Sequence, residues 1–138
     1  MASEHNNLKS SFQKWMPIKE RIDGRVISKD LYVHTGEVWW VSWGKNIGFE
    51  QDGKSDIFTR PTVVIKVLSR NTFLVAPLTT VNKEHKFRIK MSDFGGKESK
   101  AIISQIRVVD IKRFQKKIGK VDAKSIIAIK KATIDMIR

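Results

Sequence analysis

The chain has 138 residues and a formal net charge of +13 at pH 7, from 27 Lys and Arg against 14 Asp and Glu. This length fits one compact domain, and 41% hydrophobic residues exclude a wholly disordered chain. No apolar run approaches the roughly 20 residues that a membrane-spanning helix needs, and the N-terminus lacks the pattern of a secretory signal. We therefore expect a cytoplasmic protein that does not cross a membrane.

The content of cysteine and histidine limits the chemistry. The chain has no Cys, and its three His residues are scattered at positions 5, 34 and 85. Disulfides, thiol nucleophiles and cysteine-bound zinc are therefore excluded, and a histidine metal cage is disfavoured. Motifs for nucleotide binding, for a serine nucleophile and for paired magnesium ions are also missing. We expect chemistry that uses neither a metal nor a cofactor.

The charge balance favours a polyanionic partner. A surplus of this size attracts nucleic acid, a phosphorylated substrate, an acidic protein or an anionic membrane face. Composition does not choose among these partners, and solubilising surface lysines give the same surplus.

The first part of the chain predicts a helix, because apolar residues between positions 8 and 22 recur every three or four residues. Pro17 lies in its middle and predicts a kink or a split into two short helices. After Gly36 the pattern predicts strands at 37–43, 62–69, 72–80, 86–91 and 100–110. Pro77 marks an edge or a bulge near the end of the third strand.

The remaining segments complete the predicted fold. The Trp-rich run at 37–43 is apolar on both faces, which favours an interior strand over a surface that stacks on bases. Residues 44–59 predict a long loop, 93–99 a turn, and 111–119 a short helix that ends at Gly119. Asp122 can cap a final helix with a wide apolar stripe at 123–137. The fold class is α+β, with a strongly curved antiparallel sheet or small barrel and helices at both ends.

Several polar side chains lie in the long loop or at the ends of the strands beside it, where functional groups are commonly placed. Arg60 precedes Pro61, and a fixed guanidinium at a strand start suits bidentate binding of a phosphate. A surface arginine beside a turn gives the same pattern. The candidates in this region are Glu50, Gln51, Lys54, Arg60, Thr79 and Thr80.

Two later strands carry further candidates. Lys86 and Arg88 alternate with apolar residues, which is typical of the wet face of a half-buried strand. Gln105 and Arg107 point together from one side of an apolar strand, so they need internal polar partners, a subunit interface or a ligand.

Four blocks of sequence together resemble one known family. The blocks GEVWWVSWGKNIGFEQDGK, RPTVVI, VAPLTT and AIISQIRVVDIKRFQKKIG resemble the MazF/PemK family of toxin endoribonucleases, over roughly residues 36–137. The resemblance implies a CcdB-like fold, which is a curved sheet resembling an SH3 barrel with a C-terminal helix, and a homodimer. It divides the chain into an N-terminal helical extension at 1–35 and a toxin domain at 36–138.

The resemblance also implies an activity and its residues. The family cleaves single-stranded RNA at short motifs without a metal, and a cognate antitoxin with an acidic tail neutralises it. Arg60 matches the family's catalytic arginine and Thr79 its catalytic threonine, and the family's glutamate and glutamine in the first loop match Glu50 and Gln51. The residues that we expect to contact substrate are Gln51, Lys54, Thr80, Lys86, Arg88, Gln105 and Arg107. The loop before Arg60 is longer than in short members, so the cleavage motif does not transfer.

These residue types fit cleavage of RNA by its own 2′-hydroxyl. Arg60 would stabilise the charge that develops on the phosphorane, and Thr79 would donate to a non-bridging oxygen. Arginine stays protonated in proteins, so Glu50 is the candidate general base, or it orients Arg60. The alternative from another class is a non-catalytic protein of the same fold, either a gyrase poison like CcdB or a small regulator that binds nucleic acid.

Overall fold

The computed structural model describes residues 2–91 and 98–138, with side chains from residue 11 onward. Along the chain lie α1 (Ala2–Asp23), β1 (Glu37–Ser42), β2 (Thr59–Val67), β3 (Thr72–Thr79), β4 (Arg88–Lys90), β5 (Lys100–Ile102), β6 (Arg107–Asp110), β7 (Phe114–Lys120) and α2 (Ala123–Ile137). Two 3₁₀ turns, Ile103–Gln105 and Ile111–Arg113, flank β6. The turn predicted at 93–99 falls outside the described residues except for its last two.

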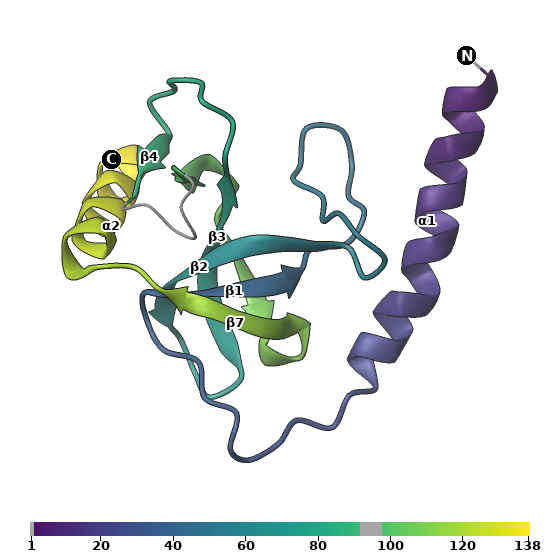
Figure 1. Cartoon of the computed structure of the whole chain (residues 1–138), viewed down its shortest axis with the longest axis horizontal. Helices are drawn as coiled ribbons and strands as arrows, with labels where there is room; N and C mark the ends of the chain where they lie inside the picture. The colour runs from purple at the N-terminus through teal and green to yellow at the C-terminus, as the bar shows by residue number, and fades with distance from the viewer. Residues whose placement is uncertain (1, 92–97) are drawn as a thin grey trace.

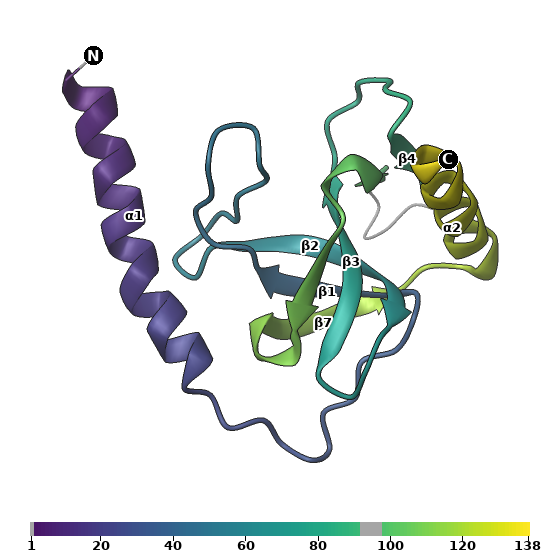
Figure 2. The same ribbon diagram turned by 180° about the vertical axis from the view of Figure 1, so that it is seen from behind.

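The strands form one antiparallel sheet in the order β4-β5-β3-β2-β1-β7, with β6 also paired to β3. The sheet twists strongly and is not closed, so that strands cross at large angles in Figure 1 and in the reverse view of Figure 2. The predicted fold class, α+β with a curved antiparallel sheet and a C-terminal helix, is confirmed.

The interior position of β1 and the packing on its two faces explain its apolar sequence. It lies between β2 and β7, so both of its edges are paired. Trp39 and Val41 pack into one hydrophobic cluster with Phe73 and Phe114. Val38 points the other way, into a second cluster that includes Ile129 of α2. The predicted interior strand is therefore confirmed.

The segment 100–110 is not the single strand that we predicted. It pairs with β3 twice, through β5 opposite Leu78 and Thr79 and through β6 opposite residues 72–75, and a 3₁₀ turn joins the two pieces. Pro77 lies in the gap between these two pairings, where its missing N–H costs no ladder hydrogen bond. It therefore marks neither an edge strand nor a bulge.

The helix predicted at 111–119 is also wrong. Only Ile111–Arg113 forms a 3₁₀ turn, and Phe114–Lys120 is β7, which pairs with β1. Spacings of three and four residues had suggested a helix, but β1 offers an unpaired strand edge. Pairing with that edge decides the local structure.

The two helices differ in how they meet the sheet. α1 is one helix of 22 residues with Pro17 inside it, not two short pieces, and Trp15 and Ile22 are buried on either side of the proline. Asp122 is the N-cap of α2, as predicted, and its side chain accepts a hydrogen bond from the Ser125 amide at 2.9 Å. No helix within the described residues is both long enough and apolar enough to cross a membrane.

Candidate active site

The register of β2 and β3 brings Arg60 and Thr79 together. Thr62 lies opposite Pro77, and Arg60 and Thr79 each lie two residues beyond this pair, toward the same end of the two strands. Both line one pocket of about 360 Å³, together with Lys54 and Thr80. The segments 43–58 and 80–87 both rise on this side of the sheet (Figure 1). The other residues that line the pocket are Trp40, Ser55, Thr59, Pro61, Leu78, Val81 and Ser99.

Two main-chain carbonyls hold the guanidinium of Arg60. Its Nε donates to the carbonyl of Asp52 at 2.9 Å, and its Nη1 donates to that of Leu78 at 3.2 Å. Nη2 has no hydrogen-bond partner in the described part of the chain. Burial lowers the pKa of Arg60, and the nearby Asp52 carboxylate opposes that shift. The result is a fixed cation with N–H groups left over for an anion.

Asp52 is a site residue that the sequence analysis missed. Its carboxylate accepts hydrogen bonds from the Asn46 amide at 2.5 Å and from Lys45 Nζ at 2.9 Å. Asn46 Nδ2 in turn donates to the carbonyls of Trp43 and Gln51. These bonds brace the loop 43–58 internally and fix the carbonyl that receives Arg60. The only sequence signal was its place in the long loop, next to the candidate Gln51.

A second pocket, of about 230 Å³, brings Glu50, Gln51, Gln105 and Arg107 together. Gln105 Oε1 accepts from the Gln51 amide at 3.4 Å, and its Nε2 donates to the carbonyl of Phe49 at 3.1 Å. Gln105, in the 3₁₀ turn before β6, therefore has internal polar partners in the loop 43–58. This is one of the outcomes that the sequence left open.

Charge and aromatic contacts place Arg107 in this second pocket. Its guanidinium lies 5.3 Å from the centre of the Trp43 ring. Burial lowers the pKa of Arg107, and the charge of Glu50 opposes the shift. Glu50 accepts from the Ile47 amide at 3.0 Å and does not line the pocket of Arg60 and Thr79. The acidic residue that acts on Arg60 is Asp52.

Lys86 and Arg88 lie apart from both pockets, in an open depression beside β4 that also contains Lys90 and Lys100. The Nη1 atom of Arg88 is buried and has no hydrogen-bond partner among the residues that the structure describes. This depression adjoins the Arg60 pocket at the start of β5, because Ser99 lines the one and Lys100 the other.

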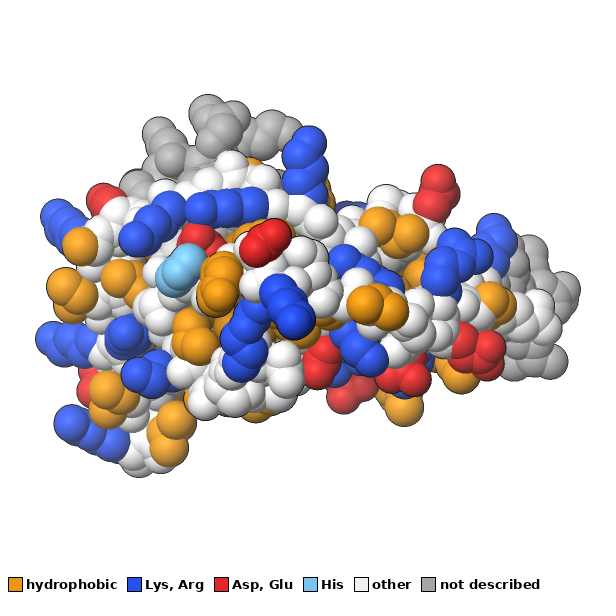
Figure 3. Space-filling view, turned by 90° about the horizontal axis from the view of Figure 1, so that it is seen from below, with side chains coloured by type: hydrophobic (Ala, Val, Ile, Leu, Met, Phe, Trp, Pro, Cys, Tyr) orange, Lys and Arg blue, Asp and Glu red, His pale blue; other side chains and the backbone are white. Residues whose placement is uncertain are grey.

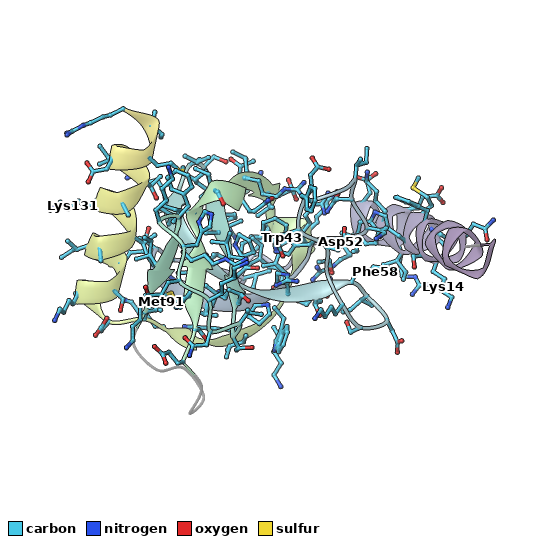
Figure 4. All side chains as sticks on the ribbon, turned by 90° about the horizontal axis from the view of Figure 1, so that it is seen from above. Lys14, Trp43, Asp52, Phe58, Met91 and Lys131 are labelled. Carbon is cyan, nitrogen blue, oxygen red and sulfur yellow. The ribbon has the colours of Figure 1, made fainter. Side chains whose placement is uncertain are left out.

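Of the three tryptophans at positions 39, 40 and 43, one is accessible, in the Arg60 pocket. Trp40 is 39% exposed, whereas Trp39 and Trp43 are buried at 7% and 3%. Figure 4 shows Trp43, Asp52 and Phe58 following one another from the centre of the domain toward α1. Lys and Arg side chains spread over the face seen in Figure 3, so net charge alone does not locate a binding site.

Among the side chains that the structure describes, at residues 11–91 and 98–138, no group of three or more His, Asp or Glu could hold a metal ion.

Comparisons with known proteins identify the family and the fold. Residues 34–137 match the family model of the PemK-like, MazF-like toxins of type II toxin-antitoxin systems. No match was found among curated proteins. A MazF structure from Deinococcus radiodurans is 18% identical with a TM-score of 0.65, and the match covers 78% of this chain and 98% of that one.

Two further solved structures share the fold. A MazE–MazF complex from Deinococcus radiodurans is 15% identical with a TM-score of 0.57, covering 78% of this chain and 97% of that one. A mycobacterial endoribonuclease in complex with its cognate antitoxin is 13% identical with a TM-score of 0.57, covering 77% and 95%. The family match spans most of the chain and includes every candidate residue discussed above. The chain therefore belongs to the PemK-like, MazF-like toxins of type II toxin-antitoxin systems, a family whose members are generally endoribonucleases.

Proposed function

We propose that this protein is an endoribonuclease that cuts single-stranded RNA by attack of a 2′-hydroxyl on the adjacent phosphate. The O2′–P bond forms as the P–O5′ bond breaks, the 2′-hydroxyl loses its proton to a base, and the leaving 5′-oxygen takes up a proton, so the products are a 2′,3′-cyclic phosphate and a 5′-hydroxyl end. The observation that carries the proposal is that Arg60 of β2 and Thr79 of β3 line one pocket of about 360 Å³, with the Arg60 guanidinium bonded to the carbonyl of Leu78, the residue before Thr79. Membership of the toxin family supports it.

Arg60 is the proposed stabiliser of the phosphorane. Its bonds to the Asp52 and Leu78 carbonyls fix the guanidinium before RNA binds, and preorganised donors of this kind are usually the largest catalytic contribution. The Nη2 N–H groups then bind the non-bridging oxygens as charge builds on them. Because the nucleophile belongs to the RNA, the step needs neither a covalent enzyme residue nor a metal.

Thr79 is the proposed second donor. Its Oγ1 accepts a hydrogen bond from the Val81 amide at 3.2 Å, which leaves the hydroxyl proton to donate to a phosphate oxygen. Glu50 lines the second pocket and not that of Arg60 and Thr79. It can therefore act as general base only if the bound RNA spans both pockets. If Glu50→Gln weakens RNA binding but not cleavage of bound RNA, then its role is to hold Arg107.

The three depressions offer a path for a single strand. Gln51 and Lys54 lie on the same loop but line neighbouring pockets, and Ser99 and Lys100 join the Arg60 pocket to the depression beside β4. We assign Trp40 to base stacking, which is typical of single-strand binding. Polar contacts come from Gln51, Thr80 and Gln105, and phosphate contacts from Lys54, Lys86, Arg88 and Arg107.

The proposed partners follow from the charge of +13 and from the family. A cognate antitoxin with an acidic segment would compete with RNA for the same cationic path, and two of the similar structures are toxin–antitoxin complexes. We also propose a homodimer that acts in the cytoplasm, with residues 1–35 as an extension of the toxin domain at 36–138. Light scattering at micromolar concentration tests the dimer.

Mapping the cut sites of the purified protein on a long single-stranded RNA tests the activity. We expect cuts at a short recurring motif, and Arg60→Ala and Thr79→Val should each slow cleavage by about two to three orders of magnitude. Growth arrest that Arg60→Ala leaves undiminished, with no RNA cut by the wild type, would instead indicate the gyrase-poison alternative.

A further inference from the structure

α1 lies outside the residues that match the family model, and it packs beside the loop 43–58 (Figures 1 and 2). Trp15 is only 4% exposed, and its ring lies 5.4 Å from that of Phe58, centre to centre. At the other end of the loop, a Cβ atom added to Gly44 would lie 2.3 Å from the Trp15 ring. One side chain of α1 therefore covers both the beginning and the end of the loop.

The residues beneath Trp15 form a narrow base of the loop, which we call the loop neck (residues 43, 44, 53 and 58). The amides of Trp43 and Gly44 donate to the carbonyl of Phe58 at 2.8 and 3.3 Å, and the Gly53 amide donates to the carbonyl of Gly44 at 2.9 Å. A Cβ on Gly53 would lie 1.6 Å from the Phe58 carbonyl oxygen. Three chain segments are thus stacked in direct backbone contact.

The neck contains a strained residue. Phe58 has a φ of +53°, a conformation that is a genuine outlier for a bulky side chain. Such strain persists only where the surroundings hold the residue in place. The Trp15 ring supplies one such contact, and the hydrogen bonds to the Phe58 carbonyl supply others.

The C-terminal end of α1 is bound to the 3₁₀ turn Ile111–Arg113, and the residues after it are bound to β7. The helix that carries Trp15 is therefore fixed at this end. Lys112 Nζ donates to the carbonyl of Asp23 at 2.7 Å. Arg25 Nη1 donates to the carbonyl of Phe114 at 2.9 Å and also contacts that of Lys112.

The neck adjoins the groups of the active site. Gly53 lies between Asp52, whose carbonyl receives Arg60 Nε, and Lys54, which lines the Arg60 pocket. The Lys54 amide and carbonyl pair with Thr59, the residue that precedes Arg60. A shift of the neck therefore moves the carbonyl partner of Arg60 and one wall of the pocket together.

We propose that α1 is a clamp on the loop 43–58, and that Trp15 is a positioning residue that sets the rate and the sequence selectivity of RNA cleavage. The structural half of this proposal stands on the contacts above, and its effect on cleavage rests on the proposed function. Trp15 touches no reacting group, so its action passes through the loop neck to Asp52 and Lys54.

Hydrogen exchange of the full chain tests the clamp without any RNA. In Trp15→Ala the amides of Gly53 and Lys54 should exchange faster by about tenfold or more, while those at the centres of β2 and β3 keep their rates. Trp15→Phe should give a smaller effect of the same sign, and remains informative if the alanine variant does not fold. Met16→Ala, at a neighbouring residue that is 51% exposed, is the matched control. Unchanged exchange at Gly53 and Lys54 in both Trp15 variants would overturn the proposal.

Cleavage of a long RNA then measures the consequence. Trp15→Ala should lower the turnover rate by about tenfold to a hundredfold and reduce the preference for the best site over secondary sites, with the same end groups. Met16→Ala should keep both the rate and the cut-site pattern. Faster loop exchange in a protein whose wild type cuts no RNA supports the clamp and contradicts the proposed function. Faster exchange with unchanged rate and selectivity contradicts the positioning role.

Discussion

Replacing Arg60 with lysine separates the geometry of the guanidinium from its charge. Arg60 bridges the Asp52 and Leu78 carbonyls through Nε and Nη1 and keeps Nη2 for the phosphate. A lysine ammonium has no planar fork, so it cannot hold both carbonyls and an equatorial phosphate oxygen in one fixed arrangement. The variant keeps the positive charge and loses the preorganisation.

The expected losses follow from these bonds. Losing one well-placed donor to the developing charge costs about two to three orders of magnitude in rate. Losing one charge-assisted bond to a carbonyl, at a half-buried site, costs about 1 to 2 kcal/mol of unfolding free energy. RNA affinity should change little, because the charge remains.

Single-turnover cleavage, anisotropy with a non-cleavable RNA and thermal unfolding measure these three quantities in Arg60→Lys. Arg70→Lys is a matched control, because Arg70 bridges the carbonyls of Leu31 at 2.7 Å and Lys29 at 3.1 Å and lines none of the three depressions described above. It should lose some stability and keep full activity. Cleavage by Arg60→Lys within about threefold of the wild type would refute preorganisation as the source of catalysis.

Variants at three other residues test further parts of the account. In single-turnover assays Thr79→Ser should retain most of the cleavage rate, whereas Thr79→Val should lose about two to three orders of magnitude, because only serine keeps the hydroxyl donor. Arg107→Gln should weaken RNA binding and reduce the slope of log affinity against log salt by about one, measured by salt titration. Burial alone would raise the pKa of Glu37, but hydrogen bonds from Lys117, the His34 amide and Trp39 bring it below 4.5 overall. Because the folded pKa is lowered, this stabilisation is present above pH 4.5 and is lost as the pH falls through that lowered value. Glu37→Gln should therefore unfold more easily than the wild type at pH 7, with a difference that narrows in acid; a difference that is constant with pH would contradict the assignment.

Much of the fold could be predicted from local pattern. The apolar run at 37–43 indicated a strand covered on both sides, and Asp122 indicated the start of α2; both are confirmed. Two predictions were wrong, the single strand at 100–110 and the helix at 111–119. They share one cause, because the structure of both segments depends on which strand edge is open for pairing. Spacing along the chain did not show that β3 accepts two partners or that β1 accepts β7.

The residues of the site also divide into those that the sequence indicates and those that only the structure reveals. Arg60 and Thr79 were found through a sequence resemblance, and β2 and β3 bring them into one pocket. Asp52 and Trp15 could not be found, because their roles depend on a backbone carbonyl and on packing between distant segments. Likewise, that the charge of Glu50 acts on Arg107 while that of Asp52 acts on Arg60 depends on how the loop folds back.

The most direct test of the central claim uses one RNA made in two forms, all-ribose and with a single 2′-deoxyribose at the mapped cut site. If the 2′-hydroxyl is the nucleophile, the all-ribose strand is cut to a 2′,3′-cyclic phosphate and a 5′-hydroxyl, equally with and without EDTA. The deoxy strand then stays intact at that site. Cleavage of the deoxy strand, 5′-phosphate ends or loss of activity in EDTA would show that water attacks and that the proposed mechanism is wrong.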